Sequence, residues 1–295
     1  MFGKIIEEIL IHHLPQGVFS EIYGGGQIGQ MLANESINLI AFTGSTKTGQ
    51  QLYELAGKRF IKAIMELGGS APGIIFDDAN LDLTLNNACA NRLANQGQCC
   101  DGLKRLIVHE KVFDAVVKMA TANFAAKKIG PAEDPATQMG PLVAKRQLDL
   151  IEAQVNDATF HGATIVTGGH SLEKKLGGAF FEPTIITGVT NRMRVWNEEV
   201  FGPVMPIVKF KTDQETIDLA NDTGYGLGAY LYTQSKERAS KVAGLIQTGM
   251  VSINGVSYIR PQNPFGGYKK SGFGREHGPD GFHEVTQIKV VARNK

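Results

Sequence analysis

Short apolar runs alternate with stretches of helical periodicity from the beginning of this sequence to its end. Residues 18–23, 38–42 and 60–67 are predicted strands, and residues 27–33 and 48–56 are the helices predicted between them. This is the rhythm of βαβ units, in which a helix connects two parallel strands. The sequence therefore predicts an α/β fold, and not a helical bundle or a β-sandwich.

The alternation continues beyond these first elements. The further predicted helices are residues 83–94, 113–125, 147–162, 213–221 and 236–246, and the further predicted strands are residues 103–109, 163–168, 180–187, 204–210, 228–232, 249–254 and 284–292. A doubly wound nucleotide-binding domain has about five or six parallel strands. Only three such elements precede the first motif that carries chemistry, so either the first domain is small or its opening half is absent from this chain.

The size and charge of the chain exclude several classes of protein. Its 295 residues suffice for one large or two ordinary domains with a buried core. With 42% hydrophobic and 20% charged residues, the composition is that of a globular protein and not of a disordered or fibrous one. Lys and Arg number 30 and Asp and Glu 29, so no basic field exists to hold a polyanion. We expect no nucleic acid partner.

The sequence favours a cytoplasmic location. Glu7 and Glu8 interrupt the amino-terminal segment where a secretory signal needs an apolar core, and no run of 18 apolar residues occurs that could span a membrane. The three cysteines, Cys89, Cys99 and Cys100, are too few for a disulfide framework. We therefore expect a reducing compartment and no membrane association.

The histidines predict no metal site. His12 and His13 are adjacent, and no carboxylate or thiol follows them at the spacing that metal ligands need. We expect no bound metal.

Two thiols lie in a glycine-containing turn just before a predicted strand. A thiolate at Cys99 or Cys100 could accept hydrogen bonds from backbone N–H groups, which would lower its pKa. The alternative is that cysteine serves as a small buried hydrophobic residue. Cys89 fits this alternative, because it lies on the apolar face of a predicted helix.

Glu66 is an acid at the end of an apolar strand, followed by two glycines. It fits an ion-paired strand end equally well as a general base whose pKa is raised by apolar surroundings. Gly44 and Ser45 end a strand and open a helix, as in anion sites at helix N-termini, although Ser is also an ordinary N-cap. Residues 198–203 set two acids and an aromatic ring in a loop, and residues 264–272 form a glycine-rich loop.

The order and spacing of five motifs resemble the NAD(P)-dependent aldehyde dehydrogenase superfamily, from about Leu14 to the carboxyl terminus. The motifs are FTGST, MELGG, NQGQCC, EEVFGPV and PFGGYKKSG. The resemblance implies a partial doubly wound cofactor-binding domain in residues 1–67 and an α/β catalytic domain with the thiol in residues 68–276. Residues 277–295 would form a C-terminal segment with an oligomerisation strand.

The resemblance also implies roles for individual residues. Cys100 would be the nucleophile, and Glu66, 34 residues upstream, the general base. The residues implied to bind NAD or NADP are Gly44, Ser45, Leu67, Glu199 and Phe201, and those implied for the substrate pocket are Asn254, Cys99 and residues 255–260.

The activity implied by the resemblance is oxidation of an aldehyde to a carboxylic acid. The Cys100 thiolate would attack the aldehyde carbon, and the resulting thiohemiacetal would lose a hydride to the nicotinamide, leaving a thioester. Glu66 would then activate the water that releases the acid. The backbone N–H of Cys100 would be one donor to the oxyanion. The sequence decides neither the aldehyde nor the choice between NAD and NADP.

The match begins in the middle of the family's cofactor domain, so the chain is expected to lack about the first third or more of a family member. An exposed strand edge would result, which invites pairing with another chain. We expect a homo-oligomer, or a missing amino-terminal segment that acts in trans. Two alternatives stay open: a catalytically dead remnant or non-catalytic oligomer subunit, and a residual thiol esterase.

Overall fold

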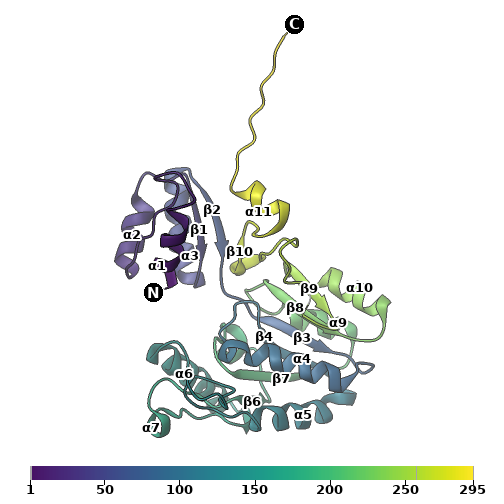
Figure 1. Cartoon of the computed structure of the whole chain (residues 1–295). Helices are drawn as coiled ribbons and strands as arrows, with labels where there is room; N and C mark the ends of the chain where they lie inside the picture. The colour runs from purple at the N-terminus through teal and green to yellow at the C-terminus, as the bar shows by residue number, and fades with distance from the viewer. Residues whose placement is uncertain (1, 257, 295) are drawn as a thin grey trace.

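The computed structural model describes residues 2–256 and 258–294 and forms two β-sheets within them. Strands β5-β6-β7-β4-β3-β8-β9 make a seven-stranded sheet, and β1-β2-β10 make a three-stranded sheet (Figure 1). The strands are β1 (Leu39–Thr43), β2 (Lys62–Glu66), β3 (Ala71–Ile75), β4 (Leu103–His109), β5 (Thr164–Thr167), β6 (Thr184–Thr187), β7 (Val204–Phe210), β8 (Gly228–Tyr232), β9 (Met250–Ile253) and β10 (Gly272–Phe273). The helices are α1 (Phe2–Leu10), α2 (Gly26–Asn34), α3 (Thr46–Arg59), α4 (Leu81–Leu93), α5 (Phe113–Ala125), α6 (Lys145–Phe160), α7 (Glu173–Leu176), α8 (Arg194–Asn197), α9 (Asp213–Asn221), α10 (Lys236–Leu245) and α11 (Gly278–Glu284).

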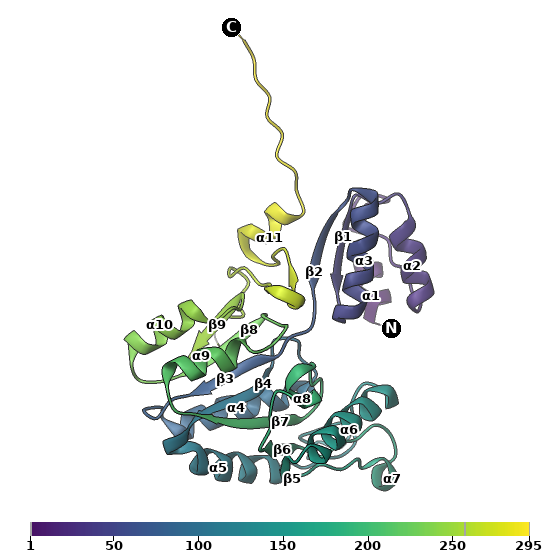
Figure 2. The same ribbon diagram turned by 180° about the vertical axis from the view of Figure 1, so that it is seen from behind.

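The larger sheet is parallel except for β5, which runs antiparallel to β6. Its interior strand β3 is buried along its whole length, as expected where helices cover both faces of a parallel sheet. Ile75 packs with the helices α4 and α5, whereas its neighbour Ile74 packs with α9 and α10. Figures 1 and 2 show these two helical layers from opposite sides.

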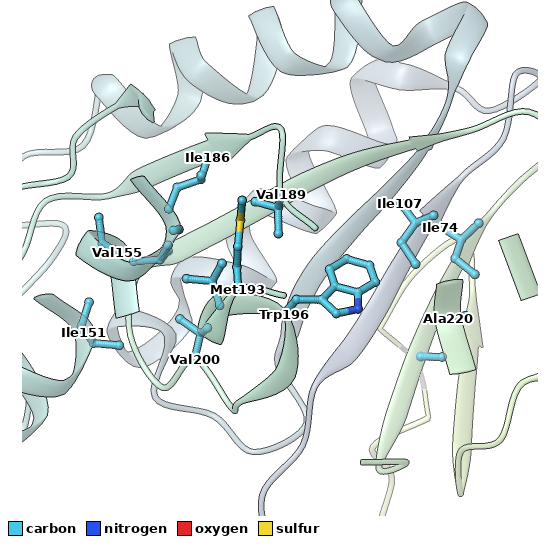
Figure 3. Close-up of a cluster of buried hydrophobic side chains, with 14 of the residues drawn as sticks. Ile74, Ile107, Ile151, Val155, Ile186, Val189, Met193, Trp196, Val200 and Ala220 are labelled. Atoms are coloured by element: carbon cyan, nitrogen blue, oxygen red, sulfur yellow. The ribbon is translucent and has the colours of Figure 1, made fainter. Parts of the chain in front are cut away.

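A tryptophan anchors the core on the α9 side of the sheet. The Trp196 ring lies beside Ile107 and Met193 in this cluster (Figure 3). Its indole N–H donates to the Asp222 carboxylate at 3.0 Å, and the Arg105 guanidinium lies 4.7 Å from the ring centroid. The fully buried Arg105 also donates to the carbonyls at the end of α9. These contacts fix β4, the strand that follows the two thiols.

The smaller sheet joins distant parts of the sequence. Strands β1 and β2 are parallel, and β10 pairs with β2 in antiparallel fashion from more than 200 residues further along the chain. The other edge of β1 pairs with no strand of residues 2–256 and 258–294. An open groove of about 840 Å³ lies there between α2, β1 and α3, lined mostly by apolar side chains.

Most predicted elements are confirmed, with ends that move by a few residues. The predicted strand at 18–23 is wrong: these residues form no ladder, because no strand in the described chain lies beside them to complete its hydrogen bonds. Strand β3 was not predicted, because Pro72 and Gly73 disfavour a strand. The pairing of β3 with β4 shifts at Ala71/Pro72. The helices α1 and α11 were not predicted either.

The C-terminal strand predicted at 284–292 pairs with no strand of the described residues. Glu284 ends α11, and the residues after it run away from the rest of the molecule without regular structure (Figure 1). A strand that pairs with another subunit stays a prediction. The domain boundaries after residues 67 and 276 also stay predictions. In the part of the chain that is described, no helix is both long and apolar enough to cross a membrane.

Candidate active site

The two thiols lie in a tight turn between α4 and β4. Asn95, Gln96 and Gly97 all have positive φ angles, of 48°, 56° and 77°, which reverse the chain just before the cysteines. The Gln98 side chain stabilises this turn: its amide N–H donates to the Asn95 carbonyl at 3.1 Å, and its Oε1 accepts from the Val143 N–H at 2.9 Å. We call residues 94–102 the cysteine loop.

A buried arginine attaches the cysteine loop to the acid-containing loop 198–203. The Arg92 guanidinium donates to the carbonyls of Val200 and Val204, each at 2.9 Å, and to that of Gly202. It also reaches the Gly97 carbonyl at 3.4 Å. A Cβ on Gly97 would overlap the Gly202 carbonyl, so only glycine permits this approach.

Glu199 lies at the junction of three motifs. Its Oε1 accepts from the Lys104 ammonium at 2.8 Å and from the Gly69 N–H at 3.0 Å. The same ammonium donates to the carbonyls of Cys99 and Cys100, at 2.8 and 2.7 Å. The second carboxylate oxygen of Glu199 fills the space where a Cβ of Gly68 would lie. The structure therefore brings Glu199 against both the thiol loop and the glycines that follow Glu66.

Glu66 is buried at the end of β2. Neither carboxyl oxygen has a hydrogen-bond partner among the described residues. Burial, and secondarily the charge of Glu276, raise the pKa of Glu66 to about 8, against a smaller opposing effect of Arg275. An ion-paired strand end would lower this pKa, so the general-base interpretation fits the environment better.

Burial and then the adjacent Asp101 carboxylate raise the pKa of the Cys100 thiol to about 11, opposed by Lys104 and a backbone N–H. No hydrogen bond joins the Cys100 thiol to the Glu66 carboxyl within the described residues, because both carboxyl oxygens lack a partner there. The connection between them is made by the backbone. A Cβ on Gly69, three residues after Glu66, would overlap the Cys100 carbonyl oxygen.

A serine joins the MELGG and PFGGYKKSG motifs. The hydroxyl of the fully buried Ser271 donates to the Gly68 carbonyl at 2.6 Å and accepts from the Gly226 N–H at 2.9 Å. The Ser271 carbonyl accepts from the Leu67 N–H at 3.0 Å. Ser271 thus connects two motifs separated by about 200 residues and fixes the backbone of Leu67 and Gly68, just before Gly69.

The amino-terminal end of α3 is open to solvent and lies next to the end of β2. Ser45 is exposed and caps the helix by accepting from the Thr48 N–H at 3.3 Å, and the Gly44 N–H donates to the Glu66 carbonyl at 3.0 Å. Leu67 packs beneath the helix, in the space left by Gly49. This geometry places Gly44, Ser45 and Leu67 together at a helix N-terminus of the kind that binds phosphate groups.

Phe201 lies close to the Glu199 site, with its ring centroid 5.6 Å from the Lys104 ammonium. Its carbonyl accepts from the Gln147 side chain at 3.0 Å.

Asn254 is not brought to the thiols. It follows β9 at the carboxyl ends of the parallel strands, whereas Cys100 precedes the amino end of β4. Its amide donates to the Thr233 carbonyl at 2.8 Å and accepts from the Thr233 N–H at 3.1 Å. These hydrogen bonds give Asn254 a local structural role, and its place in the substrate pocket stays a prediction.

Another residue of the predicted pocket segment does reach the cysteine loop. The Tyr258 hydroxyl donates to the Asp101 carboxylate at 3.2 Å and lies 2.5 Å from the Tyr230 hydroxyl.

Three of the residues that connect the loops of this site were not predicted from the sequence. Lys104, Arg92 and Ser271 are polar side chains in buried elements, and all are at most 1% exposed. For Lys104 the available signal was its position next to Arg105 inside an otherwise apolar strand, because buried cations need specific partners. Nothing in the sequence around Ser271 separated it from an ordinary loop serine.

The two sheets with helices on both faces define an α/β protein in which a thiol loop, a buried acid and a helix N-terminus lie on neighbouring segments. The model of the "Aldehyde dehydrogenase family" matches residues 1–291, and the chain belongs to that family. It is 39% identical over 279 residues to a succinate-semialdehyde dehydrogenase [NADP(+)] of Deinococcus radiodurans, covering 94% of this chain and 58% of the relative. It is also 39% identical to retinal dehydrogenase 2 of Gallus gallus, over 98% of this chain and 55% of that one.

Solved structures agree. Lactaldehyde dehydrogenase from Escherichia coli superposes with a TM-score of 0.93 at 36% identity, covering 98% of this chain and 60% of that one. Betaine aldehyde dehydrogenase from Staphylococcus aureus, solved in complex with NAD+, superposes with a TM-score of 0.91 at 35% identity over 95% and 56% of the two chains. The chain thus spans somewhat more than half the length of these relatives.

Proposed function

We propose that this chain carries the catalytic part of an NAD(P)-dependent aldehyde dehydrogenase that oxidises an aldehyde to a carboxylic acid through a thioester on Cys100. The observation that carries the proposal is the convergence at Gly69. Its N–H donates to the Glu199 carboxylate, a side chain there would overlap the Cys100 carbonyl, and Glu66 lies three residues before it. One short segment thus connects the proposed nucleophile, base and cofactor ligand.

The residues present fit a dinucleotide. The exposed N-terminus of α3, next to Gly44 and Ser45, offers the first backbone N–H groups of the helix to a pyrophosphate, whereas the Gly44 N–H itself donates to the Glu66 carbonyl. Glu199 is partly exposed while one of its oxygens is held, so it can accept ribose hydroxyls. The bound nicotinamide supplies the hydride acceptor. The relatives include an enzyme named for NADP(+) and one solved with NAD+, and we propose either cofactor for this chain.

In this proposal Cys100 attacks the aldehyde carbon as the thiolate. Because burial and Asp101 disfavour that thiolate, a base must remove the thiol proton before attack. The Cys100 N–H would donate to the oxyanion. Glu66 would then take a proton from the water that attacks the thioester, and its pKa of about 8 makes it an effective base near neutral pH.

We further propose that the free edge of β1 pairs with a strand supplied by an additional family segment, in trans or in a longer chain. The open groove at this edge is lined by Leu39, Phe42, Leu52 and Leu55, among other side chains. A parallel sheet normally has both edges and faces covered, so the groove suits an apolar strand. The family relatives have the additional length that such a segment needs.

The proposed activity is tested by mixing the purified chain with NAD or NADP and a panel of aldehydes, alone and with the amino-terminal segment of a relative. Absorbance of the reduced cofactor is the readout, and a p-nitrophenyl ester is assayed in parallel. We expect cofactor reduction, stronger when the segment is added. Ester turnover alone would indicate a residual thiol esterase, and silence in both assays would indicate a dead remnant or a non-catalytic subunit; either result contradicts the proposal.

A further inference from the structure

The side chain of Lys104 lies inside the core, between the thiol loop and the acid-containing loop. Only 1% of it is exposed, whereas 18% of its partner Glu199 is exposed. An ammonium has three N–H donors, and each has an acceptor within 2.8 Å: the carbonyls of Cys99 and Cys100 and the Glu199 carboxylate. The side chain therefore has no donor left for water or for a ligand.

We propose that Lys104 is a positioning residue that holds Glu199 and the backbone of Cys99 and Cys100 at a fixed separation. Two carbonyls that share one cation cannot move independently of it, and Glu199 is held from the other side by the Gly69 N–H. Movement of the acid loop is thus transmitted to the sulfur-bearing backbone. The consequence for catalysis rests on the proposed function: the ribose ligand and the nucleophile would keep one geometry.

The hydrogen bonds of Lys104 show that it does more than fill space in the core. An apolar side chain could replace the volume of Lys104, but it would leave the Cys100 carbonyl without this donor, the Cys99 carbonyl with only the Gly102 N–H at 3.3 Å, and Glu199 without its cation. Arg92 also links these loops, through the carbonyls of Gly97, Val200, Gly202 and Val204, but among the described residues it makes no hydrogen bond to the Glu199 carboxylate. Arg92 therefore cannot replace the link to the acid.

Two readouts test this role without cofactor or aldehyde. The first is hydrogen exchange of the Gly69 amide, whose N–H donates to Glu199 and so reports whether the carboxylate stays in place. The second is the rate of iodoacetamide alkylation of Cys100 from pH 7 to 11. It is measured with Cys99→Ala throughout, so that the only other thiol is the fully buried Cys89.

For Lys104→Met we expect Gly69 exchange to accelerate at least about tenfold. We also expect alkylation of Cys100 at neutral pH to slow by about tenfold, because the remaining charges that face the thiol, Asp101 and Glu199, both oppose its ionisation. The matched control is Lys111→Met, an exposed lysine paired with Asp77 at 3.1 Å, which should change neither readout. Wild-type exchange and alkylation in Lys104→Met would overturn the proposal.

Glu199→Gln provides a second variant in case Lys104→Met does not fold. It leaves Lys104 with its two carbonyls. Gly69 exchange should again accelerate, because an amide oxygen accepts from the Gly69 N–H more weakly than the carboxylate does. Alkylation of Cys100 should become faster, because a negative charge is removed. A purely structural defect would not shift alkylation in opposite directions in the two variants. Unchanged Gly69 exchange in Glu199→Gln would overturn the proposal. If both readouts respond in a chain that oxidises no aldehyde, the positioning role stands and the proposed function fails.

Discussion

At the scale of single residues, the site contains several buried ionisable side chains. Glu66 has no hydrogen-bond partner in the described chain, and its pKa is raised to about 8 chiefly by burial. Lys104 and Arg92 are fully buried cations whose partners are mainly backbone carbonyls of the loops they hold. A buried acid without a partner costs stability and is retained where chemistry needs it.

The raised pKa of Glu66 makes a prediction about stability. Its folded-state pKa lies above its unfolded value of about 4.5, so the folded state binds the proton more tightly. Below about pH 4.5 the Glu66 carboxyl is neutral in both the folded and the unfolded state, and its burial costs least. As the pH rises toward and through 8, stability is lost because the carboxyl ionises more readily in the unfolded state. Glu66→Gln should be more stable than the wild type at pH 9 by up to a few kcal/mol.

Urea unfolding of both proteins at several pH values measures this difference. The advantage of Glu66→Gln should shrink as the pH falls to 5. Glu54→Gln, on the exposed face of α3, is the control and should show no such trend. An advantage that does not change with pH would show that Glu66 is not buried as a neutral acid.

At the scale of elements, glycines decide how closely the motifs approach. Gly69→Ala should displace the cysteine loop, because the added methyl would overlap the Cys100 carbonyl and press on Leu227. We expect a loss of about 1–3 kcal/mol in the free energy of unfolding, typical of overpacking, and altered alkylation of Cys100. Gly57→Ala is the matched control: it lies in α3 with open space around it, so it should stabilise the chain by about 0.5–1 kcal/mol. Equal effects of the two changes would contradict the close packing at Gly69.

The helices and strands with clear periodicity were predictable from the sequence. Strand β4 and helices α5 and α9 have the predicted bounds. Strand β3 was not predictable, because Pro72 and Gly73 disfavour a strand and only the neighbours β4 and β8 override that preference. The opposite error occurs at residues 18–23, where a strand was predicted and none forms. Their composition favours a strand, but a strand exists only where another one pairs with it.

The candidate site divides in the same manner. Cys100, Glu66, Glu199 and the opening of α3 were predicted from motifs, and the structure brings Glu199 and the backbone after Glu66 against the cysteine loop. Asn254 contacts Thr233 at the carboxyl ends of the strands, and its place in the substrate pocket stays a prediction. The links through Lys104 and Ser271 depend on long-range contacts that no local pattern encodes.

At the scale of the whole molecule, the chain exposes apolar surface that suits a partner. Ile288, Val290 and Val291 are 94%, 87% and 73% exposed in the segment that leaves the body after α11. We predict that this segment pairs with another subunit. Val290→Lys should therefore lower the mass measured by light scattering, while Gln287→Lys, which adds the same charge to a polar position, should not. A mass that is unchanged by Val290→Lys would argue against this interface.

The central claim is that Cys100 forms the acyl intermediate and Glu66 promotes its hydrolysis. Mass spectrometry of the chain after brief reaction with p-nitrophenyl acetate tests both parts, with fragmentation that separates the adjacent Cys99 and Cys100. We predict an acetyl group on Cys100, which accumulates in Glu66→Gln and turns over in the wild type. An acetyl group on Cys99 instead, or equal persistence with and without the Glu66 carboxyl, would contradict the account.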